Sequence, residues 1–183
     1  MLLKEVITTA LTYLGDEEIA LDKNVVEHPK LNTLVRCANI VIKEIATDYL
    51  PLTEQEQVEV KDGRISYDSL SYRVLEVLSV KNARTDTKSL FRHTPSCLEI
   101  VNKDIERADV KYNYMPTDVG IDDECPISPL VSAKTVAMGV CSEFCLIEGM
   151  YEQSVMFSDR YKEDLRGAVR KKGELRIKPR RWY

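Results

Sequence analysis

The segment of residues 126–172 constrains the fold more than any other, because its apolar residues follow the period of two long helices joined at one glycine. Ser128 followed by Pro129 predicts the start of the first helix, since the hydroxyl can accept a free amide of the first turn and proline needs no amide there. Gly149 suits the left-handed conformation that ends a helix, and the apolar period restarts directly after it. A connection this short makes the two helices antiparallel.

Each predicted helix carries one apolar face, which must be buried against another element. The first face holds Ala133, Ala137, Val140, Cys141, Phe144 and Ile147, and the second holds Phe157, Tyr161, Leu165 and Ala168. We expect Phe144 and Phe157 to face each other across the hairpin and to lie mostly buried.

Two further helices are predicted before any strand. Apolar residues spaced three and four apart fill residues 3–14, and Gly15 marks the end of a helix over residues 2–14. A second stripe begins at Leu31 and ends at the Leu50–Pro51 step, where the residue before proline is disfavoured in a helix. These helices are too short to be stable alone, so they must share a core with the hairpin.

The period of the pattern changes to two between residues 53 and 116, which predicts strands. Asp62–Gly63 is the strongest short hairpin signal, and it predicts that a strand containing Val58 and Val60 pairs with residues 64–67. Further strands are predicted at residues 72–80, 89–92, 98–101 and 109–115. The buried face of residues 72–80 is predicted to hold Val74, Leu78 and Val80.

The predicted fold class is α+β and mainly α: a helical bundle with an inserted small antiparallel β subdomain and an extended basic C-terminal tail. Two N-terminal helices and the long C-terminal helical hairpin form the bundle. Residues 1–52 hold the N-terminal helices, 53–116 the β subdomain, 117–172 an acidic linker and the hairpin, and 173–183 the tail. A chain of 183 residues, 44% of them hydrophobic, can bury one core and a small subdomain.

The sequence lacks the patterns that catalysis or cofactor binding requires, so we expect no enzymatic activity, cofactor or metal. His28 and His93 stand in predicted loops without a partner pattern. Cys141 and Cys145 are one helical turn apart, but a structural zinc needs a tetrahedral ligand set and no second pair lies near them. The acidic run at residues 122–124 could bind magnesium, and a solvated linker is the more usual role of such a run.

The five cysteines are an odd number and stand mostly in apolar helical contexts, which predicts buried free thiols in a reducing compartment. We expect no disulfide, and folding in the cytosol. The longest apolar runs are too short to span a bilayer and Lys4 interrupts the first, so neither a membrane-spanning helix nor a signal peptide is predicted.

Charge is distributed unevenly along the chain. The formal net charge is −4, but residues 166–183 carry +7, from eight basic residues against the single acid Glu174, which leaves −11 on the rest. The basic residues are Arg166, Arg170, Lys171, Lys172, Arg176, Lys178, Arg180 and Arg181. A basic extension on an acidic body is typical of a segment that binds nucleic acid or an acidic protein surface; the alternative is a solvated, disordered end.

Trp182 is the only tryptophan, and it stands beside Arg180, Arg181 and Tyr183. Burying a tryptophan removes about 150–250 Å² from water, which at about 25 cal/mol/Å² gives an upper bound of about 4–6 kcal/mol. These residue types are favoured as anchors at protein interfaces, so the sequence predicts a docking arm. The alternative is that Trp182 folds back onto the protein's own core.

The order of these parts, and several short segments within them, resemble one protein family. The segments are Leu31-Asn32-Thr33-Leu34, Asp48-Tyr49-Leu50-Pro51, Tyr72-Arg73-Val74-Leu75-Glu76-Val77, Pro129-Leu130-Val131, Glu143-Phe144-Cys145, Gly149-Met150-Tyr151-Glu152 and Asp159-Arg160-Tyr161. Their layout and hydrophobic spacing, over nearly the whole chain, are similar to those of the head-to-tail adaptor proteins of tailed bacteriophages, also called connector or tail tubular proteins.

This resemblance implies a virion structural protein that is assembled in the host cytoplasm. About twelve copies would form a homo-oligomeric ring beneath the portal and receive the next tail protein. DNA would pass through the channel during ejection without sequence-specific binding, and acidic walls would repel its phosphates. The resemblance carries over no catalytic residue, cofactor or membrane contact. The resemblance also implies that residues 172–183, here named the basic segment, form a portal latch. The latch residues are Lys172, Arg176, Lys178, Arg180, Arg181, Trp182 and Tyr183.

A nucleic-acid-binding module is the second hypothesis, in which residues 166–181 bind phosphates. The basic residues are not interleaved with the several aromatic residues that base stacking needs, which favours the ring adaptor. Salt separates the two hypotheses, because binding through phosphates weakens steeply as salt rises.

Overall fold

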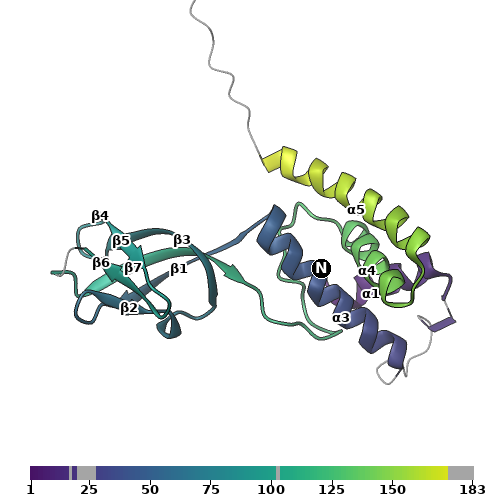
Figure 1. The fold of residues 1–183 in the computed structure, drawn as a ribbon, viewed down its shortest axis with the longest axis horizontal. Helices are drawn as coiled ribbons and strands as arrows, with labels where there is room; N and C mark the ends of the chain where they lie inside the picture. The colour runs from purple at the N-terminus through teal and green to yellow at the C-terminus, as the bar shows by residue number, and fades with distance from the viewer. Residues whose placement is uncertain (17, 20–27, 102–103, 173–183) are drawn as a thin grey trace, which may run out of the picture. The chain divides into compact units, whose positions relative to one another are not determined.

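The computed structural model describes residues 1–16, 18–19, 28–101 and 104–172, and the chain folds as two compact units (Figure 1). One unit is helical and is formed by Met1–Ile42 together with the described part of Val119–Tyr183. The other, Lys43–Asp118, contains the strands. The chain therefore leaves the helical unit after its second long helix and returns later to complete it.

The long helices are α1 (Leu3–Leu14), α3 (Pro29–Glu44), α4 (Ala133–Ile147) and α5 (Tyr151–Lys172). The buried residues of α1 and α3 follow the helical spacing that the sequence predicts. Gly15 ends α1 in the left-handed conformation, with a φ of 77°, and its N–H donates to the carbonyls of Leu11 and Thr12. α3 continues into a π-helical turn, η2 (Ile45–Tyr49).

Helix α4 is the core of the helical unit. Its buried residues, from Thr135 to Cys145, cover nearly every side of the helix. Gly139 permits a very close approach of its neighbours, because a Cβ there would lie 2.8 Å from Val41 Cγ1 of α3 and 3.0 Å from Tyr161 Cε2 of α5. A helix that is buried on all sides must be surrounded by other elements, which here are α1, α3 and α5.

Helix α4 begins later than the sequence predicts. Ser132 caps it, because its hydroxyl accepts the backbone N–H of Thr135 at 3.2 Å and lies 2.8 Å from the Thr135 hydroxyl. Ser128 instead closes a turn, in which its carbonyl accepts the N–H of Val131 at 3.0 Å. The predicted start at Ser128 is wrong because the later serine offers the same cap with a second partner.

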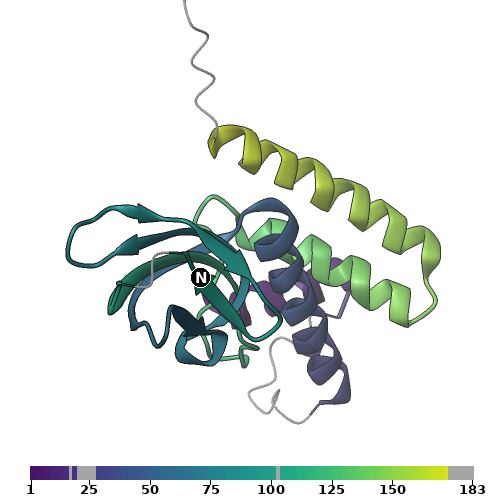
Figure 2. The same ribbon diagram turned by 60° about the vertical axis from the view of Figure 1, so that its left-hand side comes forward.

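The predicted helical hairpin is confirmed, and Figures 1 and 2 both show α5 running back beside α4. Gly149 joins the two helices with a φ of 76°. Ser142 and Ser154 connect the two helices, because each hydroxyl donates to the backbone carbonyl of the other residue, at 3.0 and 2.9 Å. Both serines are buried, so these hydrogen bonds fix the register of the hairpin.

The two phenylalanines of the hairpin are buried, as predicted. The ring of Phe157 packs against Tyr13 of α1, with 6.4 Å between the ring centroids. Lys30 Nζ of α3 lies 5.0 Å from the ring centroid of Phe144. The aromatic rings of the hairpin thus contact the two N-terminal helices.

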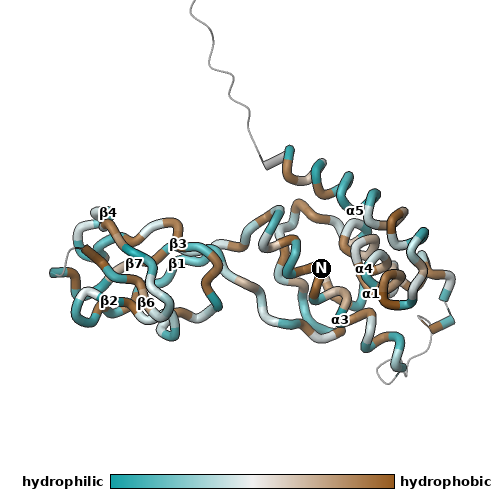
Figure 3. Tube along the Cα trace, in the orientation of Figure 1, coloured by the Kyte–Doolittle hydropathy of each residue, from teal (hydrophilic) through white to brown (hydrophobic). Residues whose placement is uncertain are grey.

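Helix α5 buries one stripe and exposes the rest of its surface. The stripe comprises Ser154, Phe157, Tyr161, Leu165 and Ala168. Figure 3 shows the resulting alternation of hydrophobic and hydrophilic residues along the helix. α5 therefore covers one side of α4 and forms an outer surface of the helical unit.

The acidic segment after the β unit is fixed to the helical unit. Asn39 of α3 binds it through both ends of its amide: Oδ1 accepts the N–H of Val119 at 2.8 Å, and Nδ2 donates to the Val119 carbonyl at 3.0 Å. The N–H of Leu3 donates to the carbonyl of Asp123 at 3.0 Å. This segment is thus an ordered part of the helical unit.

The β unit contains two antiparallel sheets. Its strands are β1 (Leu52–Glu59), β2 (Arg64–Ser66), β3 (Arg73–Asn82), β4 (Lys88–Ser89), β5 (Phe91–His93), β6 (Cys97–Ile100) and β7 (Arg107–Met115). The strand order is β1-β7-β3-β4 in the larger sheet and β2-β6-β5 in the smaller. Side chains from both sheets form one core, which includes Val80, Leu98, Val110 and Tyr112.

The turn at Asp62 and Gly63 forms as predicted, with φ values of 53° and 73°, and backbone hydrogen bonds between Lys61 and Arg64 close it. The strands beside the turn are not partners, however, because β1 pairs with β7 and β2 pairs with β6. The predicted hairpin is therefore wrong. The turn carries the chain from one sheet to the other, and a local turn signal cannot show which distant strand each arm will join.

Strand β3 buries different residues from those predicted. Its register with β7 shifts twice, at Leu75 and at Leu78, and each shift adds one residue to β3. The added residues are 37% and 44% exposed, and Val77 takes the buried position predicted for Leu78. Two bulges change which side chains face the core, so strict alternation fails on this strand.

The prediction of a mainly helical bundle with a small β insertion is wrong. Of the residues that the structure describes, 46% are helical and 26% lie in strands, which form two antiparallel sheets. The β unit has its own hydrophobic core, so the fold is α+β, and the β unit is a second compact unit beside the helical one in the chain's organisation. In a strand with one buried face, only every second residue is apolar. The sequence pattern of such strands therefore suggests a smaller core than two facing sheets form together.

Candidate docking surfaces

The predicted portal-latch residues lie at the end of the described chain and beyond it. Lys172 is the last residue of α5. Arg176, Lys178, Arg180, Arg181, Trp182 and Tyr183 lie outside the described residues. Helix α5 fixes where the basic segment starts, at the end of the helix opposite the Gly149 turn (Figure 1).

The buried cysteines are unsuited to nucleophilic chemistry, because burial raises the pKa of each thiol. All five are free, and four of them are buried. Burial raises the pKa of Cys37 to about 11 and the pKa of Cys141 to about 12, so both thiols stay protonated at neutral pH. Over the described ranges, no group of three His, Cys, Asp or Glu side chains could hold a metal ion.

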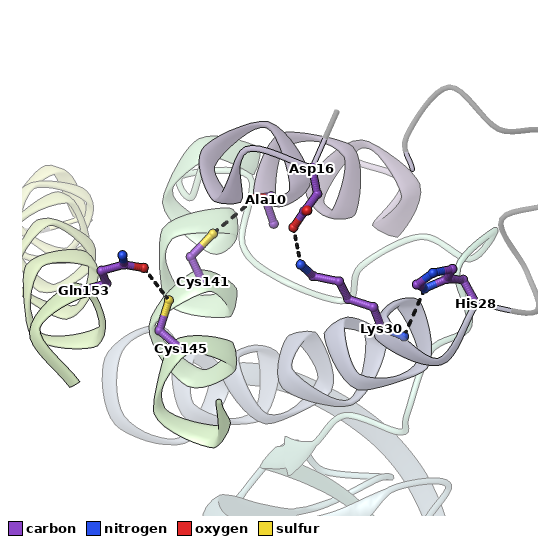
Figure 4. Close-up of polar contacts among 7 residues, drawn as sticks. All are labelled: Ala10, Asp16, His28, Lys30, Cys141, Cys145 and Gln153. Atoms are coloured by element: carbon purple, nitrogen blue, oxygen red, sulfur yellow. Dashed lines mark hydrogen bonds and ion pairs between the residues drawn. The ribbon is translucent and has the colours of Figure 1, made fainter. Parts of the chain in front are cut away.

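Cys141 and Cys145 point to different neighbours in Figure 4. The thiol of Cys141 donates to the carbonyl of Ala10 in α1 at 3.5 Å, and the thiol of Cys145 donates to Oε1 of Gln153 in α5 at 3.9 Å. Although they are one helical turn apart, the two thiols belong to separate packing contacts.

The histidines also have structural contacts. His28 Nδ1 accepts the backbone N–H of Lys30 at the start of α3, at 3.3 Å, and Lys30 pairs with Asp16 (Figure 4). His93 Nδ1 lies 3.1 Å from the hydroxyl of Tyr67 in the β unit. These contacts connect loops and element ends, as expected for histidines that support packing.

A pocket of about 610 Å³ opens beside β3 in the β unit. Its lining includes Tyr67, Tyr72, Arg73 and His93. The ring of Tyr72 stacks on Tyr114 with 4.4 Å between centroids, so the rim of the pocket is aromatic. The lining does not converge on one kind of charge, and the pocket therefore does not indicate a ligand class.

Exposed apolar residues gather at the turn between α4 and α5. Leu146 and Ile147 end α4, while Tyr151 and Val155 lie one helical turn apart at the start of α5. Their side chains are 50%, 58%, 67% and 60% exposed, respectively. Single exposed apolar residues are common, but a group of them is typical of a contact with another protein. These four residues are named the tip patch.

The charges beside the tip patch are acidic. Glu148 in the turn and Glu152 in the first turn of α5 are exposed, and Glu143 near the end of α4 is half-buried. Lys30 lines the same shallow pocket as Glu148, but it already pairs with Asp16. The tip patch is therefore an apolar surface with a negative rim.

A basic surface lies further along α5. Lys162, Arg166 and Arg170 follow one another at a spacing of one helical turn, and all three are exposed. This surface leads to Lys172, so the positive charge of the basic segment begins within the helix.

The tip patch was not predicted from the sequence. Ile147 was predicted on the buried face of its helix, whereas the residue is 58% exposed at the helix end. The available signal was the position of Tyr151 and Val155, which stand off the stripe through Phe157 and Tyr161 that α5 buries. Apolar residues outside a buried stripe would have indicated a second apolar surface.

Comparison of the sequence with protein-family models and with curated proteins finds no match. Among the helices within the described residues, none is both long enough and apolar enough to cross a membrane.

Proposed function

We propose that the protein is a head-to-tail adaptor of a tailed bacteriophage, a virion structural protein without enzymatic activity. Copies of it form a ring between the portal and the tail, and DNA passes through the channel of that ring. The order of its segments supports this proposal through the family resemblance. The observation that carries it is the tip patch, whose four neighbouring residues are at least half exposed and call for a protein partner.

A closed ring requires each subunit to present one surface and to receive a different one. The helical unit has two such surfaces, the acidic-rimmed tip patch at one end of α5 and the basic surface of Lys162, Arg166 and Arg170 toward the other. Opposite charges at the two ends of one helix favour contact between unlike ends of neighbouring copies, which a head-to-tail ring provides.

The basic segment is the proposed portal latch. Trp182 supplies an aromatic anchor, and Arg180 and Arg181 guide the segment to an acidic surface. If so, Trp182→Ala raises the dissociation rate from the portal, whereas neutralising both arginines lowers the association rate and its salt dependence. Arg92→Gln, an exposed arginine of β5, is the matched control and leaves both rates unchanged.

The test is assembly with the portal protein of the same phage, measured by mass determination and imaging of the complex. A ring of defined mass bound to the portal is the expected result. If the two proteins form no complex at concentrations that saturate comparable contacts, the adaptor function is wrong. Deleting residues 172–183 without any loss of binding would remove the latch from the proposal.

Nucleic-acid binding is the second candidate, and the basic surface of Lys162, Arg166 and Arg170 favours it. In this case the affinity for any DNA duplex falls steeply with salt, and Trp182→Ala changes it little. Fluorescence anisotropy with labelled duplexes of unrelated sequence, over a range of salt, measures both effects.

A further inference from the structure

The tip patch defines the chemistry of what can cover it. Its centre is formed by Leu146, Ile147, Tyr151 and Val155, and its rim carries exposed carboxylates. An apolar or aromatic side chain would remove this centre from water, and flanking positive charges would pair with the rim. The matching partner is therefore a segment in which an aromatic residue stands next to arginine or lysine.

The chain contains such a segment. Trp182 and Tyr183 directly follow Arg180 and Arg181. Arginine next to an aromatic residue can pair with a carboxylate and lie over a ring such as that of Tyr151. The basic segment and the tip patch are thus complementary both in apolar character and in charge.

The distance along α5 decides which copy supplies the segment. From Tyr151 to Lys172 the helix is about 32 Å long. The residues from Lys172 to Trp182 span at most about 33–36 Å when fully extended. Trp182 could reach the tip patch of its own chain only as a straight strand lying back along the helix. A second copy places no such demand on the length of the segment.

We infer that the basic segment of one copy binds the tip patch of a second copy, with Trp182 on the apolar centre and the arginines at Glu148 and Glu152. This contact joins two different surfaces, so it can close reciprocally between two copies or continue around a larger ring. It rests on the proposed ring of copies and deepens it by naming the segment that covers the tip patch, and the contact itself needs no portal. A portal that takes the basic segment would have to displace it from the tip patch.

The single tryptophan allows a direct test with the full chain and no portal. Trp182 is the only tryptophan, so emission excited selectively in tryptophan reports the environment of the basic segment alone. We expect the emission to move to shorter wavelength and its anisotropy to rise as protein concentration increases. Sedimentation velocity at the same concentrations should show the mass rising in step.

Two substitutions within the tip patch should abolish these changes. Val155→Asp and Tyr151→Ser place a charge or a small polar group in the apolar centre, so both should return the emission to that of exposed tryptophan at every concentration. The matched control is Ile40→Ser on α3, which is 50% exposed outside the tip patch and should behave as the unaltered protein. Circular dichroism confirms that each variant keeps its helices.

A charge exchange tests the pairing itself. Reversing the rim with Glu148→Lys and Glu152→Lys should weaken association at least tenfold, and Arg180→Glu with Arg181→Glu should do the same. Mixing or combining the two reversed sets should restore it, because opposite charges again face each other. A general loss of folding would not be rescued in this way.

Three results would overturn the inference. Tryptophan emission that is blue-shifted equally at all concentrations would mean that the segment binds its own chain. Emission typical of exposed tryptophan throughout would mean that it does not bind protein in this way. Association that survives Val155→Asp would place the contact elsewhere. Assembly with the portal is measured separately, so a failure of this contact between copies is distinguishable from a failure to bind the portal.

Discussion

Gly139 shows how strongly a single residue can determine packing in the helical unit. Its role does not depend on an unusual backbone conformation, because it lies within α4. Glycine is needed there because side chains of α3 and α5 occupy the space that a Cβ would take. The close approach of three helices therefore depends on the absence of one methyl group.

Gly139→Ala should destabilise the helical unit by about 1–3 kcal/mol, because the added methyl group would overlap Val41 and Tyr161. Gly167→Ala is the matched control on α5, where a Cβ would meet nothing within 4 Å. It should stabilise the helix by about 0.5–1 kcal/mol, since alanine loses less conformational entropy than glycine. Urea unfolding followed by circular dichroism measures both, and equal effects of the two variants would contradict the packing at Gly139.

The buried thiol of Cys141 makes the stability of the helical unit sensitive to alkaline pH. Burial raises its pKa from 9.0 to about 12, so the folded state disfavours the thiolate relative to the unfolded state. The resulting stability is fully present below pH 9 and is lost as pH rises from 9 toward 12. Cys141→Ala should reduce this loss, and Cys37 accounts for a further part of it because burial raises the pKa of that thiol to about 11. Melting temperatures measured across this pH range test the difference.

At the scale of elements, the sequence prediction and the structure place the start of α4 at different serines, and two substitutions can tell which serine is the cap. Ser132→Ala should cost about 1 kcal/mol, because it removes the hydroxyl that accepts the N–H of Thr135. Ser128→Ala should cost much less, since that residue lies in a turn before the helix. Thermal unfolding of the two variants measures the contrast. A larger cost at Ser128 would restore the start that the sequence predicts.

The sequence was sufficient for the elements whose signal is local. The stripes of α1 and α3, the Gly149 turn and the Asp62–Gly63 turn could be predicted because each depends on neighbouring residues. Pairing of β1 with β7 could not, since those strands are separated by most of the β unit and no local rule selects among partners. The bulges of β3 likewise depend on its register with β7.

The candidate site was predicted only in part, because one of its two components depends on how the helices pack. Charge and composition indicated the basic segment, because they need no knowledge of the fold. The tip patch depends on which apolar residues remain uncovered once α1 and α3 have packed against the hairpin. Ile147 fits the helical stripe of α4 in sequence and is exposed in the structure, so periodicity alone cannot separate core from contact surface.

At the scale of the whole molecule, each unit has its own core, so each should unfold as a separate transition. Residues 43–118 expressed alone should fold, because their core is supplied entirely by the strands and loops of that unit. Dispersed amide resonances and a cooperative thermal transition are the expected results. A fragment that lacks both would show that the β unit depends on the helices.

The insertion of the β unit also sets a time order during synthesis. Helices α1 and α3 leave the ribosome first, but α4, against which they pack, follows only after the β unit has been made. At about 5–20 residues per second, the roughly 90 residues between them take about 5–20 s to emerge. Throughout that interval the apolar faces of α1 and α3 have no hairpin to cover them, and the nascent chain is at its most vulnerable to aggregation.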